Sequence, residues 1–203
     1  MRLHPHSLFP NHQFRIENLD LLVARHIPRE HRINPALKQE LFNTLHKSGI
    51  ISYGGYGEDR STMWKGTYME QTGAFTHLGV DVNVRHKTPI QLPFETRVID
   101  SRIFTDLDVG WGPRLILETS HPANPLIILG HLSSPLPQQN TILPANVPFA
   151  TVGTYPSNGN VFEHLHIQLV ARTTPLNVLT LDGYGQPSEL PLYPDPFNTN
   201  FVV

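Results

Sequence analysis

Short apolar runs, separated by turns rich in proline, glycine and asparagine, recur along the chain from about residue 75. The chain holds 19 prolines and 14 glycines among 203 residues, a content that favours turns and short strands over long helices. The runs that we expect to be strands are 80–84, 115–117, 126–129, 149–152 and 163–170. This pattern predicts a mainly β fold whose core is an antiparallel sandwich or a barrel-like sheet.

An N-terminal helical extension and an irregular C-terminal tail flank the predicted core. Asn34 suits an N-cap, Pro35 suits the first helical position and Gly49 suits the residue after the end, which predicts a helix over about 35–48. An apolar cluster at 19–24 fits either a short helix or a strand. The predicted division is an N-terminal extension with one helix (1–70), the core (71–175) and a tail packed on the core (176–203).

Composition excludes several classes of function. With 15 Lys and Arg against 17 Asp and Glu, the formal charge is −2 and no basic stripe suggests a nucleic-acid partner. No stretch approaches the roughly 18 apolar residues of a membrane helix. The N-terminus lacks the pattern of a signal peptide, which favours a cytoplasmic location. Because there is no cysteine, histidines and carboxylates must hold any transition metal.

His164 and His166 form an alternate pair on the last predicted strand. Residues i and i+2 of a strand share one face about 6.6 Å apart, while the apolar residues between and after them face the core. Such a pair can divide the work of a metal site, one imidazole ligating and the other moving protons. It could equally be two polar residues on a half-solvated face, since His4 and His6 have the same spacing in the N-terminal segment.

Two upstream segments offer further donors. His77 and Asp81 are four residues apart, about 13 Å on a straight strand, and Gly79 between them could allow a bend that brings them together. His131 directly follows an apolar strand, where a side chain protrudes from a rigid scaffold. Taken singly, each residue fits a strand cap or a turn as well as it fits a metal site.

Together the three segments read His-x3-Asp, then His, then His-x-His. This order resembles the lysostaphin-type zinc metallopeptidases, the M23 family of peptidoglycan endopeptidases, over residues 75 to 170, about half of the chain. The matching segments are His77-Leu-Gly-Val-Asp81, Lys87-Thr-Pro-Ile90 with Val98, His131-Leu-Ser133 and His164-Leu-His-Ile167.

The resemblance implies a role for each of the five residues. His77, Asp81 and His166 would hold one Zn²⁺ per chain and leave the fourth position to water, while His131 and His164 would be the catalytic pair. The implied activity is hydrolysis of peptide bonds, in peptidoglycan-type peptides, by a metal-activated water. It also implies an extracytoplasmic location, against the missing signal peptide. The sequence leaves the scissile bond and the oligomeric state open.

Two other functions compete with this interpretation. One is a non-catalytic peptide-binding or regulatory module on the same fold, although such relatives typically lose ligands and all five positions are filled here. The other is a cupin-like metal oxygenase, which would place its His-x-His first and a Glu ligand after it. This chain has its pair last, followed by Gln168.

Several positions depart from the family pattern. Lys87, Thr96 and Asn146 stand where the family has glycines, Glu163 takes the place of a proline, and Gln168 replaces a common glutamate. None of these changes removes a metal or proton-transfer residue. They bear on the groove, because loops rather than the sheet set specificity.

Further polar residues have weaker signals. Tyr53, Tyr56 and Tyr68 are candidates to assist the oxyanion, whereas Glu58 and Arg60 fit a solvated loop pair better than a groove wall. The other histidines are expected to be surface or capping residues: 12, 26, 31, 46, 86 and 121. The His-rich start of the chain raises the hypothesis that the N-terminal extension covers the site.

Overall fold

A computed structural model gives the fold and describes residues 1–27, 34–66, 68–105, 110–159, 161–175, 177 and 180–203. Its helices are α1 (Pro5–Leu8), α2 (Leu19–His26), α3 (Pro35–Leu45), α4 (Ser61–Trp64) and the 3-10 helices η2 (Tyr68–Gln71) and η3 (Pro187–Leu192). Its strands are β1 (Gln13–Ile16), β2 (Ile50–Gly54), β3 (Thr76–His77), β4 (Val80–Val82), β5 (Pro89–Ile90), β6 (Thr96–Ile103), β7 (Pro113–Thr119), β8 (Leu126–Gly130), β9 (Ile142–Leu143), β10 (Ala150–Thr151), β11 (Leu165–Val170) and β12 (Tyr184–Gly185).

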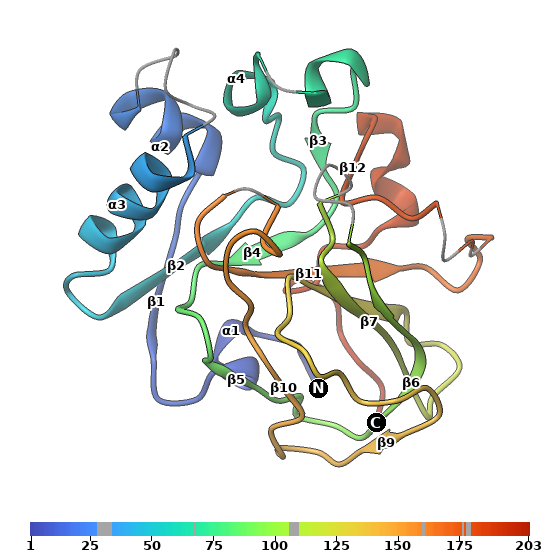
Figure 1. The fold of residues 1–203 in the computed structure, drawn as a ribbon. Helices are drawn as coiled ribbons and strands as arrows, with labels where there is room; N and C mark the ends of the chain where they lie inside the picture. The colour runs from blue at the N-terminus through green and yellow to red at the C-terminus, as the bar shows by residue number, and fades with distance from the viewer. Residues whose placement is uncertain (28–33, 67, 106–109, 160, 176, 178–179) are drawn as a thin grey trace.

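An eight-stranded sheet runs through the molecule in the order β1-β2-β4-β11-β8-β7-β6-β9 (Figure 1). Strand β11 lies between β4 and β8 and pairs antiparallel with both. The mainly β core is therefore confirmed. The sheet is mixed rather than wholly antiparallel, because β1 and β2 run parallel. Parallel strands need a long crossover, which α2 and α3 supply here.

The main core lies on one face of this sheet. Leu165, Ile167 and Leu169 of β11 are fully buried there, as the strand alternation predicts. The opposite face of β11 presents His166 and Gln168, and both are also buried. A second apolar cluster, which includes Trp111, covers part of that face. Both faces of β11 are thus removed from water, so its polar residues need partners inside the protein.

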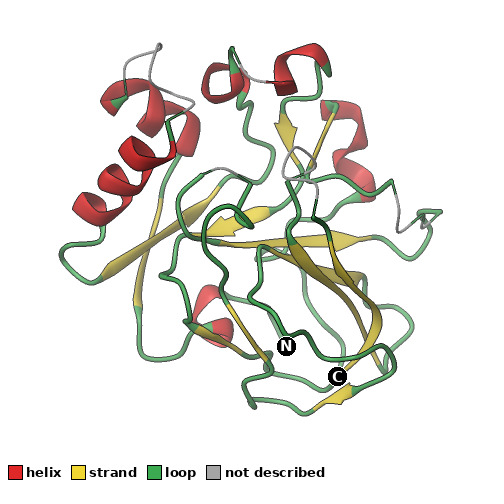
Figure 2. Cartoon of the chain, in the orientation of Figure 1, coloured by secondary structure: helices red, strands yellow, loops and turns green. Residues whose placement is uncertain are grey.

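Most of the helices lie on one side of the sheet, at the top of the view in Figure 2, whereas α1 lies apart, lower in the view. The apolar cluster at 19–24 begins α2, and the helix predicted over 35–48 is α3, which ends at Leu45 with His46 as its C-cap. Gly49 has a φ of +80° but lies in the turn beyond, so its prediction as the residue after the helix was wrong. The helix stops earlier because the His46 side chain binds its last turn. The Nδ1 atom of His46 donates to the Phe42 carbonyl, and its Nε2 atom accepts from the backbone N–H of Ser52.

The C-terminal tail packs on the core and also completes it. Strand β12 pairs with β3, and Phe201 packs in the main core. Likewise β1 and β2, from the first 70 residues, join the main sheet. The division at residues 70 and 175 stays a prediction. None of the helices in the described ranges is long and apolar enough to cross a membrane.

Candidate metal centre

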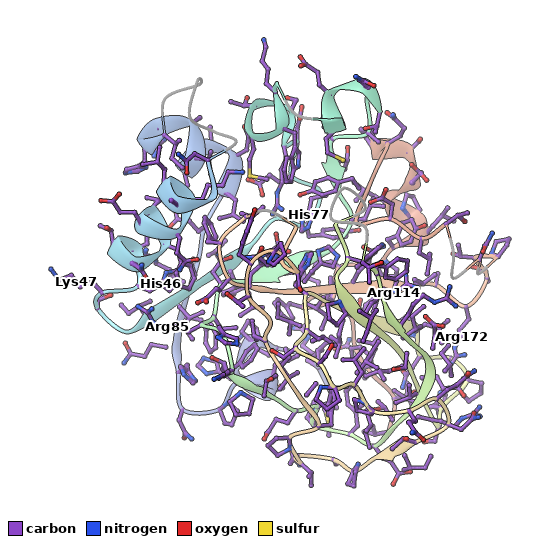
Figure 3. All side chains as sticks on the ribbon, viewed as in Figure 1. His46, Lys47, His77, Arg85, Arg114 and Arg172 are labelled. Carbon is purple, nitrogen blue, oxygen red and sulfur yellow. The ribbon has the colours of Figure 1, made fainter. Side chains whose placement is uncertain are left out.

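Three strands place the predicted metal ligands together. His166 of β11 and Asp81 of β4 are direct cross-strand partners, so their side chains rise from neighbouring positions on one sheet face. His77 ends β3, with two residues between it and the start of β4, and Figure 3 labels it near the middle of the molecule. All three side chains are buried, at 1 to 3% exposure. Residues 89 positions apart in the sequence therefore meet in a dry site.

The donor atoms converge on one point. Nε2 of His77 lies 3.0 Å from Nδ1 of His166, and Oδ1 of Asp81 lies 3.4 Å and 3.1 Å from these two nitrogens. These are the only three residues, among those that the structure describes, whose donor atoms cluster closely enough to hold a metal ion. Two imidazole nitrogens and one carboxylate oxygen are ordinary Zn²⁺ donors.

Contacts on the far side of each ring determine which nitrogen faces the site. Nδ1 of His77 lies 3.1 Å from the Gly55 carbonyl, which can only accept, so this nitrogen carries the proton. Nε2 of His166 lies 3.0 Å from Oε1 of Gln168, whose amide donates to the Asp182 carbonyl. The glutamine that departs from the family pattern therefore fixes the ring of His166. In both histidines the nitrogen in the site is left with its lone pair.

Three lone pairs thus point at one another inside the protein, an arrangement that is repulsive until a cation lies between them. A proton is disfavoured, because burial and then the charge of Arg60 lower the pKa of His77 to about 3. Burial alone would raise the pKa of Asp81, but His77 and Arg60 hold it well below its ordinary value. His77 therefore stays neutral and Asp81 stays ionised, the protonation states that bind metal.

His131 and His164 line the same cavity as the three donors. Nδ1 of His164 donates to the Phe162 carbonyl, and its Nε2 lies 3.6 Å from Oδ1 of Asp81. Nδ1 of His131 donates to the Ser157 carbonyl, 3.1 Å away. The two rings lie 4.4 Å apart between centroids. Burial first, and neighbouring imidazoles next, lower the pKa of His131, and burial also lowers that of His164, so both rings stay neutral and keep an unprotonated Nε2.

The backbone around His131 is specialised for this position. His131 has a φ of +61°, in the left-handed region that a side chain other than glycine rarely adopts. It follows Gly130, the cross-strand partner of His166, and a Cβ on Gly130 would meet the Trp111 ring at 2.8 Å. The chain therefore turns sharply at the end of β8, and this turn places the His131 ring next to the His164 ring. Strain of this kind is typical of functional positions.

Gly79 serves the site by close approach. A Cβ at this position would lie 2.6 Å from Nε2 of His166 and 2.6 Å from the Ile167 carbonyl. The chain bends at Gly79, between β3 and β4, as predicted, and this bend does not need a positive φ. The residue lets β11 pass directly against the turn between His77 and Asp81, and this contact joins the donors.

The cavity around these groups has a volume of 270 Å³. Apolar side chains form much of its wall, notably Trp64, Met69, Trp111 and Val161. Trp111 packs edge-on against His166 at 5.2 Å between centroids, and its Nε1 donates to the Leu181 carbonyl. The reacting groups are consequently surrounded by a dry, low-dielectric wall.

The tyrosine at the site is Tyr184, which the sequence did not single out. Its ring packs on His77 at 5.3 Å between centroids, and burial raises its pKa to about 12. Tyr53 packs instead in the main core, Tyr56 contacts the Leu190 carbonyl, and neither lines the cavity. The side chain of Tyr68 lies outside the described part of the chain. Only the Asp-Gly-Tyr-Gly turn of the tail could have hinted at Tyr184.

Glu58 and Arg60 are buried, so their prediction as a solvated loop pair was wrong. Their side chains are 4% and 2% exposed and lie 3.0 Å apart. Nη1 of Arg60 donates to Oδ2 of Asp81 at 2.7 Å and to the Tyr184 hydroxyl at 3.1 Å. The polar loop therefore reaches the metal site and does not extend into solvent.

The remaining histidines lie away from the centre. Those at 12, 26, 86 and 121 are partly or fully exposed, 46 caps α3, and 31 falls outside the described residues. No described residue before Arg60 lines the cavity. Helix α1, in the His-rich start, lies low in the view of Figure 1, whereas β3 lies near its top. The His-rich start therefore does not reach the site, whereas Arg60, Trp64 and Met69, at the end of the N-terminal extension, line the cavity, so covering of the site by the extension stays a prediction.

No protein-family profile and no curated protein matches this chain. Among solved structures, the chain is similar to a zinc-containing peptidase from Vibrio cholerae (19% identity, TM-score 0.42, covering 53% of this chain and 31% of that one). It is also similar to the catalytic domain of lysostaphin from Staphylococcus simulans (18%, 0.43, 50% and 71%) and to the M23 protein EnpA from Enterococcus faecalis (18%, 0.42, 56% and 77%).

These matches span about half of this chain at less than one-fifth identity, and the chain covers under a third of the first protein. At such TM-scores they carry no inference about activity. Any functional inference depends on the side chains of the cavity.

Proposed function

We propose that this chain is a zinc-dependent metallopeptidase that hydrolyses peptide bonds with a metal-activated water. The observation that carries the proposal is the convergence of three unprotonated donors, from His77, Asp81 and His166, beside two further imidazoles with free Nε2 atoms. Three protein donors leave one coordination position open, which is the arrangement of catalytic rather than structural zinc.

Zinc, when bound to these donors, supplies a Lewis acid and brings the pKa of a coordinated water to about 7. Everything else comes from the protein. Asp81 brings the negative charge that retains a dication in a dry site, and Gly55 and Gln168 hold the two rings in the required tautomers. Apolar neighbours such as Trp111 exclude bulk water and strengthen every charge interaction inside.

Proton transfer falls to His164 and His131. Because the Nδ1 of His164 donates to the Phe162 carbonyl, its Nε2 is an acceptor and can take the proton of an attacking water. His131 has the same tautomer, so its Nε2 donates only after it has gained a proton. An imidazolium in this pair then stabilises the developing oxyanion and returns the proton to the leaving amine.

The substrate is proposed to be a peptide, of the kind found in peptidoglycan. The resemblance of the His-x3-Asp, His and His-x-His segments to M23 endopeptidases supports this choice. The narrow cavity supports it too, because an extended chain with small side chains can reach donors that are themselves only a few per cent exposed. No oligomeric partner is needed to complete the five-residue set.

A cleavage screen tests the proposal. Zinc-loaded protein is incubated with purified cell walls and a panel of short peptides, and new amino groups are counted. The His77→Ala variant, which lacks one donor, is the matched control. Cleavage by the wild type alone supports the proposal. A zinc-loaded wild type that binds walls without cutting any peptide would favour the binding module instead.

A further inference from the structure

Arg60 joins the N-terminal part of the chain to the proposed metal centre. Its Nη1 donates to Oδ2 of Asp81 at 2.7 Å, which leaves Oδ1 as the carboxylate oxygen that faces His77 and His166. The guanidinium and the carboxylate are each only 2% exposed. One oxygen of Asp81 is therefore already used, and its carboxylate plane is fixed from behind.

The charge of Arg60 is balanced by a second carboxylate. Oε2 of Glu58 accepts from Nε of Arg60 at 3.0 Å. The other oxygen of Glu58 accepts from the backbone N of Asp20, at the start of α2, at 2.7 Å. Asp20 in turn accepts from the backbone N of Met63. A continuous set of hydrogen bonds thus runs from α2 and α4 through Glu58 and Arg60 to Asp81.

The glycine-rich loop makes room for this arrangement. Gly55 has a φ of +102°, and a Cβ there would lie 2.2 Å from Nη2 of Arg60 and 2.9 Å from Nδ1 of His77. Only a glycine can bring its carbonyl to His77 while the guanidinium packs against its Cα. One loop, residues 54–60, therefore orients two of the three donors.

We propose that Arg60 is a positioning residue for the metal. It holds Asp81 so that Oδ1 alone is available as a ligand, and Glu58 fixes Arg60 in the pose that does this. The inference rests on the metal site of the proposed function and extends it: the N-terminal segment forms the outer part of the centre. A carboxylate with both oxygens free could take two coordination positions, including the one required by water.

The two bonds to carboxylates explain why this residue is an arginine. The planar guanidinium donates from Nε to Glu58 and from Nη1 to Asp81, in directions that a single ammonium cannot reproduce. A lysine would keep the charge but give up one of the carboxylates. A lysine at position 60 therefore separates the effect of the positive charge from the effect of the guanidinium geometry.

The test measures zinc binding, independently of peptide cleavage. Zinc affinity is determined by competition with a chelator for the wild type, Arg60→Met and Arg60→Lys, and Co²⁺-substituted protein reports the coordination number through its visible spectrum. We expect affinity to fall about 10- to 100-fold in Arg60→Met, the range typical of lost outer contacts, and by less in Arg60→Lys. The cobalt spectrum should change in Arg60→Met.

A buried arginine removed alone leaves Glu58 without its partner, which can prevent folding. The double variant Glu58→Gln with Arg60→Met removes the pair together and is measured in the same way. A folded variant of either kind with wild-type zinc affinity and an unchanged cobalt spectrum would overturn the inference, even if its thermal stability falls. A wild type that binds no zinc at all would instead reject the proposed function.

Discussion

Nε2 of His77 lies 3.0 Å from Nδ1 of His166, and neither nitrogen carries a proton, because each ring donates its single N–H to an acceptor behind it. Two lone pairs at this distance, with the Asp81 carboxylate beside them, are stable only around a cation. The burial that keeps protons away leaves a metal ion as the group that relieves this repulsion.

The metal content follows from that relationship. Purified protein should carry close to one zinc per chain, measured by elemental analysis, and His166→Ala should lose it. His12→Ala, which changes an exposed histidine away from the cavity, is the control and should keep its zinc. Stoichiometric zinc in folded His166→Ala would contradict the assignment of His166 as a donor.

His164 should separate metal binding from proton transfer. Since it is a base beside the donors rather than one of them, His164→Ala should keep its zinc while hydrolysis falls by about 10²- to 10⁴-fold. His131→Ala should behave in the same way. Zinc content and peptide cleavage are measured on one preparation. Loss of zinc from His164→Ala would exchange the roles of His164 and His166.

The sequence predicted the five residues of the site because their types and order carry the chemistry. It could not predict Glu58 and Arg60, since charged residues in a loop of glycines and tyrosines look solvated until the fold buries them. Tyr184 lay in a tail without periodic pattern, and only the pairing of β12 with β3 brings it to His77. Local pattern identified donors, whereas the residues around them depend on tertiary contacts, from Arg60 to Asp81 across 21 positions and from Arg60 to Tyr184 across 124.

The strands of the core were predictable for the same reason, because alternation and short apolar runs are local signals. The parallel pairing of β1 with β2 was not, since it depends on how α2 and α3 pack. Helix α3 ends at Leu45, short of Gly49, because the His46 side chain caps it. Gly49 is of the type that usually follows a helix end, but the contact of the His46 side chain ends this helix earlier, and the sequence does not reveal that contact.

Gly79 should not tolerate a side chain. Its substitution by alanine places a methyl group 2.6 Å from both Nε2 of His166 and the Ile167 carbonyl, so β11 must move. We expect Gly79→Ala to lose about 1–3 kcal/mol of unfolding free energy, as in other overpacked sites, and to bind zinc more weakly. Gly183→Ala is the control, since its Cβ would meet His166 at an ordinary 3.4 Å. Equal zinc affinity in the two variants would contradict this account.

The stability of the metal-free protein should fall as the pH is lowered. The pKa of His77 is about 3 in the native state, and those of His131 and His164 are also lowered from 6.5, in each case first by burial. Below pH 6.5 these histidines therefore bind protons in the unfolded chain but stay neutral in the native chain, which favours unfolding. For His77 the loss should begin near pH 6.5 and continue towards about 3.

Denaturant titrations of metal-free protein at several pH values measure this loss. Each histidine that stays neutral only in the native state contributes about 1.4 kcal/mol per pH unit. His77→Gln removes one such group, so its slope should be shallower by about that amount. Identical slopes in the wild type and His77→Gln would show that the native state accepts a proton at His77.

Lys87 should be replaceable by glycine with a gain in stability. Its φ of +66° lies in the left-handed region, where the M23 pattern has a glycine. Its side chain is exposed, so replacing it by glycine removes the backbone strain without losing a buried contact. Strain in this region costs about 1–2 kcal/mol, and the extra entropy of an unfolded glycine offsets about half of it, so Lys87→Gly should gain roughly 0.5 kcal/mol. The midpoint of denaturant unfolding measures the gain. Lys47→Gly, at an exposed turn residue without a positive φ, should gain nothing, and an equal gain there would remove the backbone explanation.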